Sequence, residues 1–179
     1  MKDLRILLSG FGGQGILFLG KVVAAAALIA GKEVTWLPSY GPETRGGACR
    51  CSVCISDKPI GSPLVPNPDA LVAMNQASCR LYIGDVRPGG LALVDSSMAA
   101  DIPVRGDIQT VPLPATQLAA GAGLAGFANM IMLGRLFRKL RFCKLAALRD
   151  GLQKCIPPRK AGMLDANLRA LKIGLDASF

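Results

Sequence analysis

The first candidate functional segment of this sequence is a cluster of glycines near its start. The run Gly-Phe-Gly-Gly-Gln-Gly at residues 10–15 follows a short apolar segment and precedes a long one. Glycine permits positive φ, and backbone N–H groups at the start of a helix bind anions, so the run is typical of a nucleotide-binding turn. The candidate binding residues are Gly10, Gly12, Gly13, Gln14 and Gly15.

The same glycines also suit a tight turn in which they serve only the close packing of a strand and a helix. A dinucleotide site needs, in addition, an acidic residue for the ribose at the end of the second strand. Leu37, Pro38 and Ser39 occupy that position, so NAD binding is disfavoured. A free-standing nucleotide-binding α/β module is nevertheless the alternative function that the glycines support.

A second candidate is the segment of residues 38–47, where proline and glycine recur so often that a loop is expected throughout. A rigid loop that carries an aromatic ring, an acid and an arginine suits a binding surface. Arg45 can pair with a phosphate or a carboxylate of a ligand, or with Glu43 inside the loop. The candidate residues are Ser39, Tyr40, Gly41, Pro42, Glu43, Arg45 and Gly46.

Histidine is absent from the chain, which removes the commonest general base and metal ligand, and we expect no catalytic residue here. Cys49, Cys51 and Cys54 form Cys-x-Cys-x-x-Cys, a spacing that matches neither zinc sites nor the longer cysteine runs of ferredoxins. On a strand, Cys49 and Cys51 share one face and Cys54 points to the other. We interpret all three as small buried hydrophobes and expect no metal site.

The elements that position these residues alternate between extended and helical patterns. Strands are expected over residues 4–9, 33–37, 48–56, 70–74, 91–94 and 108–113, and helices over 16–30, 76–82, 115–120, 127–140, 144–154 and 160–177. This order predicts a three-layer α/β/α fold with a largely parallel sheet, a Rossmann-like first βαβ unit and a helical C-terminal part. We expect residues 1–179 to form a single domain.

The charge is uneven: the net charge is +9, and residues 135–160 contain nine Lys or Arg but one acid, Asp150. This basic stretch suits an acidic partner or a phosphorylated cofactor, or it is a solvated helix face. Nucleic acid is not an expected partner, because aromatic residues for base stacking are scarce there. The apolar run at residues 16–30 is too short for a bilayer and no signal peptide is evident, so we expect a cytoplasmic protein without a membrane partner.

Three segments occur in an order and spacing that resemble the gamma subunit of 2-oxoacid:ferredoxin oxidoreductases. They are residues 10–15, residues 34–47 and the run Leu-Val-Ala-Met-Asn-Gln at residues 71–76. The resemblance adds Asn75 and Gln76 to the candidate site, and it continues through residues 57–63 and, more loosely, 129–134 and 167–170. Residues 38–43 are more similar to the 2-oxoglutarate or branched-chain type than to the pyruvate type. Cys49 and Cys54 depart from the family pattern.

The resemblance implies an oxidoreductase complex that converts a 2-oxoacid and coenzyme A to an acyl-CoA and CO2 while reducing ferredoxin. Thiamine diphosphate and iron–sulfur clusters would then reside on other subunits, and this chain would hold no cofactor tightly. Its partners would be the alpha, beta and delta-type subunits of the same enzyme, with ferredoxin as the electron acceptor of the complex. The chain would be inactive alone, could form a homodimer in isolation, and would place residues 10–15 and 39–47 against the thiamine-binding subunits.

Overall fold

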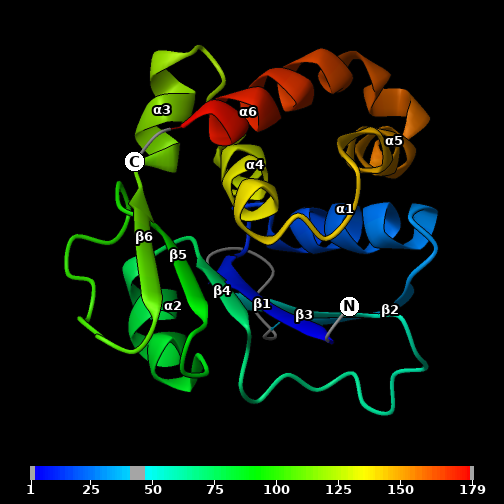
Figure 1. The fold of residues 1–179 in the computed structure, drawn as a ribbon. Coiled ribbons are helices and arrows are strands. Elements are labelled where there is room, and N and C mark those ends of the chain that lie inside the picture. Colours follow the sequence, from blue (N-terminus) through cyan, green and yellow to red (C-terminus); the bar gives the residue numbers. More distant parts are fainter. Residues whose placement is uncertain (1–2, 41–46, 178–179) are drawn as a thin grey trace.

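The computed structural model describes residues 3–40 and 47–177, and Figure 1 shows how their elements are arranged. The elements in chain order are β1 (Leu4–Phe11), α1 (Ile16–Ile29), β2 (Glu33–Tyr40), β3 (Ala48–Ser56), β4 (Ala70–Ala73), α2 (Gln76–Tyr82), η1 (Ile83–Asp85), β5 (Leu91–Asp95), β6 (Gln109–Leu113), α3 (Ala115–Gly121), α4 (Ala128–Leu140), α5 (Leu145–Cys155), η2 (Pro158–Met163) and α6 (Leu164–Asp176).

The six strands form one sheet in the order β2-β3-β1-β4-β5-β6. The pairs β1–β4, β4–β5 and β5–β6 are parallel, whereas β3 runs antiparallel to both of its neighbours, β1 and β2. The predicted largely parallel sheet is therefore confirmed. The first unit, β1–α1–β2, has its two strands parallel as predicted, but β3 is inserted between them.

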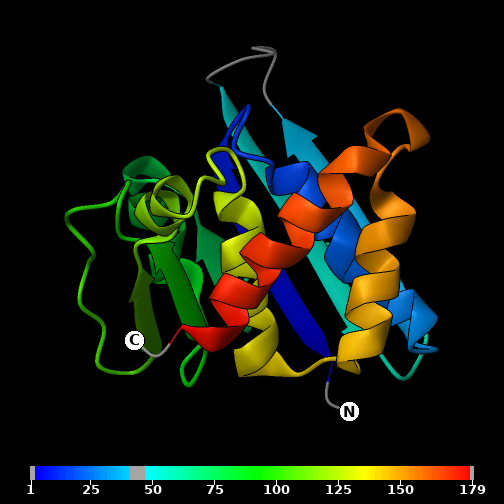
Figure 2. The ribbon, with the colours of Figure 1, turned by 90° about the horizontal axis from the view of Figure 1, so that it is seen from above.

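Helices cover both faces of the sheet, which confirms the predicted three layers. The helices α1 and α4 pack on one face with α5 and α6 above them, as Figures 1 and 2 show, and α2 lies on the opposite face. The side chains of the central strands divide in the same way: Ile6 and Leu8 of β1 belong to the core under α1, and Leu7 belongs to a smaller core under α2. The helical C-terminal part, α3 to α6, is likewise confirmed.

The upper helices approach each other closely at glycines. A Cβ on Gly134 of α4 would lie 2.2 Å from the carbonyl oxygen of Leu171, and a Cβ on Gly174 of α6 would lie 1.9 Å from that of Ile131. Because these neighbours are backbone atoms of the facing helix, no side-chain movement can relieve the overlap. The α4–α6 crossing therefore requires glycine at both positions.

Three predicted boundaries are wrong. Strand β2 continues through Pro38 to Tyr40, where a loop was expected, because β2 is an edge strand and an edge tolerates a residue without an N–H. Strand β1 extends to Phe11, so Gly10 lies in the strand rather than in the turn. The last helix was expected from residue 160, but residues 158–163 form a 3-10 turn after Pro157 and α6 begins at Leu164.

Candidate functional site

The glycine turn joins the end of β1 at Phe11 to the start of α1 at Ile16. Gly13 has φ of 100° and Gly15 has φ of 72°, both in the range that favours glycine. The N–H of Gly12 donates to the carbonyl oxygen of Gly47 at 3.0 Å, and the N–H of Gln14 donates to that of Phe11 at 3.1 Å. Two N–H groups of the turn are therefore engaged within the chain and are not available to an anion.

The turn lies where an α/β sheet usually binds its ligand. Helix α1 leaves the end of β1 for the upper face, whereas α2 leaves the end of the adjacent strand β4 for the lower face (Figure 1). Such a divergence opens a crevice beyond the carboxyl ends of the two strands, and ligands of this fold class bind in that crevice.

A hollow of about 250 Å³ lies at this crevice with Gln14, Met74 and Asn129 in its lining, and the side chain of Gln14 bridges the two turns there. Its Oε1 accepts hydrogen bonds from the N–H of Phe11 at 2.7 Å and from Nδ2 of Asn75 at 3.0 Å, while its Nε2 donates to the carbonyl oxygen of Met74 at 2.9 Å. Asn75 in turn caps α2, because its Oδ1 accepts from the N–H of Ser78 at 2.8 Å. An amide of the chain itself thus ties the two turns together where a nucleotide would have to enter.

Close packing explains why glycine is needed at Gly10 and, in addition to its positive φ, at Gly15. A Cβ on Gly10 would lie 2.7 Å from Oε1 of Gln14, and a Cβ on Gly15 would lie 2.3 Å from Nδ2 of Asn129. Asn129, at the start of α4, donates from that nitrogen to the carbonyl oxygen of Gly15 at 3.2 Å. These contacts favour the interpretation that the glycines allow close approach of strand, turn and helix.

Asn129 is a site residue that the sequence pattern does not single out, although Asn129 begins a segment that carries the family resemblance. No local pattern could have identified its partner, because Gly15 and Asn129 are far apart in the sequence. Asp95 was missed in the same way: it is fully buried at the end of β5, accepts from Oγ1 of Thr116 at 2.6 Å and thereby fixes the start of α3.

The second candidate segment is described only in part. Ser39 is exposed at the end of β2, and the backbone of Tyr40 pairs with Cys49. Gly41, Pro42, Glu43, Arg45 and Gly46 lie outside the described residues. Ser39 lines the same hollow of about 270 Å³ as Gly10 and Phe11, so this segment begins next to the glycine turn.

The remaining candidate, Gln76, faces a different part of the molecule. Its side chain accepts from the N–H of Asp101 at 2.9 Å and donates to the carbonyl oxygen of the same residue. It therefore fixes the loop after β5, while Gln14 and Asn75 form the centre of the glycine turn.

The three clustered cysteines are buried, as predicted: Cys49 and Cys51 face α1, and Cys54 faces the carbonyl oxygens of Ser62 and Pro63 on the opposite side. Burial raises the pKa of the Cys49 thiol and raises that of Cys51 to about 12. A thiol held protonated is a poor metal ligand and nucleophile. Within residues 3–40 and 47–177, no group of three His, Cys, Asp or Glu is placed to bind a metal ion.

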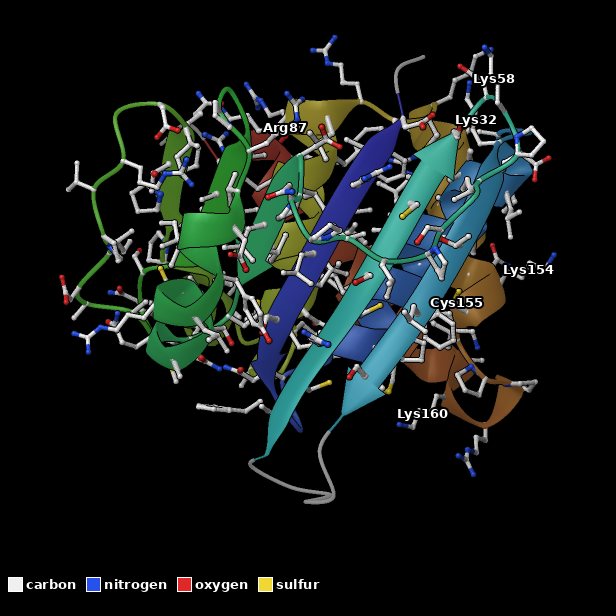
Figure 3. The ribbon with its side chains drawn as sticks, turned by 90° about the horizontal axis from the view of Figure 1, so that it is seen from below. Lys32, Lys58, Arg87, Lys154, Cys155 and Lys160 are labelled. Carbon is white, nitrogen blue, oxygen red and sulfur yellow. The ribbon has the colours of Figure 1, made fainter. Side chains whose placement is uncertain are left out.

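The basic stretch is almost entirely at the surface. Arg135 is buried and donates to the carbonyl oxygen of Ala177, whereas the other eight Lys and Arg of residues 135–160 are exposed. Lys154 and Lys160 lie on the β2 side of the molecule (Figure 3). The ion pairs found among the described residues all involve cations outside this stretch.

Comparison with known proteins agrees with the resemblance seen in the sequence. The family model of the pyruvate ferredoxin/flavodoxin oxidoreductases matches residues 5–177. The chain belongs to this family. A solved structure supports the predicted relationship to gamma subunits of 2-oxoacid:ferredoxin oxidoreductases. It is the gamma subunit of keto/oxoacid ferredoxin oxidoreductase from Geobacter sulfurreducens, which has a TM-score of 0.83 and 31% sequence identity to this chain. The match covers 97% of this chain and 96% of that chain.

Two relatives from this family differ in how much of their length corresponds to this chain. The 2-oxoglutarate synthase subunit KorC of Methanothermobacter thermautotrophicus is 36% identical over 97% of this chain and 93% of its own length. The ketoisovalerate oxidoreductase subunit VorA of Methanothermobacter marburgensis is 38% identical over 98% of this chain, which spans 36% of that subunit. In VorA, the same unit is thus part of a longer polypeptide.

A helix that spans a bilayer must be long and predominantly apolar. None of the helices within residues 3–40 and 47–177 is both long and apolar enough to cross a bilayer.

Proposed function

We propose that the chain is the gamma subunit of a 2-oxoacid:ferredoxin oxidoreductase. In this complex a 2-oxoacid and coenzyme A give an acyl-CoA and CO2, and the electrons pass to ferredoxin. The observation that supports this proposal most strongly is the extent of the similarity. The family model matches residues 5–177, and this chain covers 93% of the length of KorC. The described fold then corresponds to the gamma unit of such a complex.

The cofactors of the reaction belong to the other subunits in this proposal. An iron–sulfur cluster needs cysteine thiolates that converge on one point. Cys49 and Cys51 face one side of the sheet and Cys54 the other, and burial holds the pKa of Cys51 at about 12, so these residues do not fit a cluster. No histidine is available as a proton acceptor. The chain therefore performs no chemical step, and its free cysteines suit the reducing cytoplasm.

The role that we assign to the glycine turn and to residues 39–47 is to lie against the thiamine-binding subunits. The hydrogen bonds of Gln14 to Phe11, Met74 and Asn75 support this role over nucleotide binding, because they fix the turn with the chain's own atoms. A preorganised surface loses little conformational entropy when a partner covers it. The free-standing nucleotide-binding module is accordingly not favoured.

For the substrate we propose 2-oxoglutarate rather than a branched-chain 2-oxoacid. KorC, a relative 36% identical to this chain, is named as a subunit of 2-oxoglutarate synthase. The resemblance of residues 38–43 to the 2-oxoglutarate or branched-chain type is in keeping with this choice, and the comparison of the two substrates below tests it.

Reconstitution tests the proposal. The chain is purified together with the thiamine-binding and ferredoxin-like subunits of a 2-oxoacid:ferredoxin oxidoreductase from the same organism, and CoA-dependent reduction of ferredoxin is measured with 2-oxoglutarate and with 2-oxoisovalerate. We expect turnover that requires this chain, is faster with 2-oxoglutarate, and is absent from the chain alone. Full turnover without the chain, or micromolar binding of NAD or ATP by the isolated chain in calorimetry, would contradict the assignment.

A further inference from the structure

One part of the sheet lacks the cover that its fold class normally supplies. Sheets with parallel strands are usually covered on both faces. On the lower face, the side chains of β4 and β5 pack against α2. Farther from α2, no helix among the described residues covers the strands β1, β3 and β2 on this face (Figure 3). The chain between β3 and β4 covers another part of these strands, where Cys54 faces Ser62 and Pro63 and where Val65 packs against the core that contains Leu7.

The uncovered part is defined by the strand register. Phe11 is paired with Ala48, Arg50 lies between Ser9 and Ser39, and Leu37 is paired with Ser52, so these side chains emerge on one face. Helix α2 forms one wall of this area through Leu81. We refer to Phe11, Leu37, Ser39, Ala48, Arg50 and Leu81 as the open sheet face.

The open sheet face carries three large apolar side chains that are exposed. Phe11 is 37% exposed, Leu37 is 38% exposed and Leu81 is 65% exposed. A hollow of about 270 Å³ lies between α2 and β3, with Phe11, Leu81 and Arg50 in its lining. Exposed apolar side chains gathered around a hollow are typical of a surface that another polypeptide covers.

The charge on this surface indicates what kind of polypeptide fits. Arg50 is exposed, no described residue forms an ion pair with it, and the lining of the hollow contains no acidic residue. A second copy of the chain would bring Arg50 toward Arg50 across a two-fold axis, and the described residues that line this hollow offer no carboxylate to compensate. A partner that offers apolar side chains and a carboxylate is the complement of this surface.

From these observations we propose that the open sheet face is a docking surface for a helix of a partner subunit, which lies beside α2 and places a carboxylate against Arg50. The inference rests on the proposed function, because it assumes that the chain works in a complex. The surface adjoins the glycine turn through Phe11, so the two areas form one continuous interface. The length of VorA is in keeping with this arrangement, since there the unit is covalently joined to a larger polypeptide.

Assembly of charge variants tests the docking surface. Arg50→Glu and Leu81→Glu are co-expressed with the partner subunits, and the amount of partner that co-elutes with the chain is measured. Arg149→Glu and Leu28→Glu are the matched controls, because both residues are exposed on the helices of the opposite face. We expect the first two variants to weaken association about tenfold or more, and the controls to assemble as the wild type does.

A second experiment keeps the wild-type charge. In an Arg50→Lys variant, carbodiimide joins the new amine to a carboxylate that lies in direct contact, and mass spectrometry of the assembled complex identifies the attached peptide. A cross-link to a partner subunit supports the proposal, whereas normal assembly of Arg50→Glu and Leu81→Glu overturns it. A cross-link between two copies, with a dimer of the isolated chain in light scattering, would also overturn it in favour of self-association.

These outcomes are separable from those of the proposed function. A complex that needs the chain for 2-oxoacid turnover, yet tolerates both variants of the open sheet face, leaves the function standing and removes the docking surface. Absence of any complex with the partner subunits removes the proposed function itself.

Discussion

Replacing Gly15 by alanine tests whether the glycine turn is built for close packing. Gly15 has φ of 72°, and a Cβ there would lie 2.3 Å from Nδ2 and 2.9 Å from Cγ of Asn129. Alanine at positive φ costs about 1–2 kcal/mol, and crowding of a packed contact costs about 1–3 kcal/mol more. The lower entropy of the unfolded alanine chain offsets up to about 1 kcal/mol. We therefore expect the free energy of unfolding to fall by about 3 kcal/mol.

Gly13 provides the matched control in the same turn. Its φ is 100°, but no atom lies within 4 Å of the position of its Cβ, so Gly13→Ala carries the backbone strain without the crowding. The net cost should be about 1 kcal/mol. In a chain of this size these losses lower the Tm by about 3 °C for Gly13→Ala and about 9 °C for Gly15→Ala.

Urea unfolding followed by circular dichroism measures both variants, together with Asn129→Ala and the double variant Gly15→Ala/Asn129→Ala. Removing the Asn129 side chain relieves the crowding, so the double variant should be more stable than the sum of the single changes predicts, by about 1 kcal/mol or more. Equal destabilisation by Gly13→Ala and Gly15→Ala, with additive behaviour in the double variant, would refute the packing explanation.

Further predictions concern helix packing, the crevice, the cysteines and the loop. Gly174→Ala should lower the free energy of unfolding by about 2 kcal/mol or more, because the new Cβ would overlap the backbone of α4. Gly121→Ala should raise the free energy of unfolding by up to about 1 kcal/mol, because the space around this position in α3 is open. Thermal melts of both variants show whether each change destabilises or stabilises the chain. Gln14→Leu should cost about 1–3 kcal/mol in urea unfolding, since the buried carbonyl of Met74 loses its donor. Burial raises the pKa of Cys51 from 9.0 to about 12, so between these pH values the folded chain retains a proton that the unfolded chain releases. The free energy of unfolding should therefore fall by about 1.4 kcal/mol per pH unit in that interval. When unfolding is measured at about pH 8–11, the Cys51→Ala variant should lose this part of the dependence of the unfolding free energy on pH. Arg45→Ala should lower turnover of the reconstituted complex while the unfolding free energy changes by less than about 0.5 kcal/mol, and unchanged turnover would count against a role for this loop.

The sequence was sufficient to predict the layers of the fold because its periodicities are local. The strand around Leu7 and the helix after it follow from two apolar runs and the glycines between them, and the strand around Leu71 follows from an apolar run that ends at Asn75 and Gln76. The insertion of β3 between β1 and β2 could not be predicted, because nothing local specifies which strand pairs with which. The continuation of β2 through Pro38 depends on the same pairing, since only an edge strand accepts proline at that place.

For the candidate site, the sequence identified the residues but not their roles. Gln14 was chosen as part of a glycine run, yet its partners at Met74 and Asn75 become visible only when β1 and β4 lie side by side. The same holds for Asn129, whose contact with Gly15 depends on the packing of α4 against the turn. A glycine run predicts a turn, whereas the contents of the crevice beyond it are decided by tertiary contacts.

The glycine turn is proposed to be a surface for partner subunits rather than a ligand site. Hydrogen exchange of its backbone amides distinguishes these two roles. Exchange at residues 12–18 is measured by mass spectrometry for the isolated chain, for the chain with NAD, ATP or coenzyme A, and for the assembled complex. We predict strong slowing in the complex and no change with any of the small molecules. Unaltered exchange in the complex, or protection by a nucleotide in the isolated chain, would contradict the account.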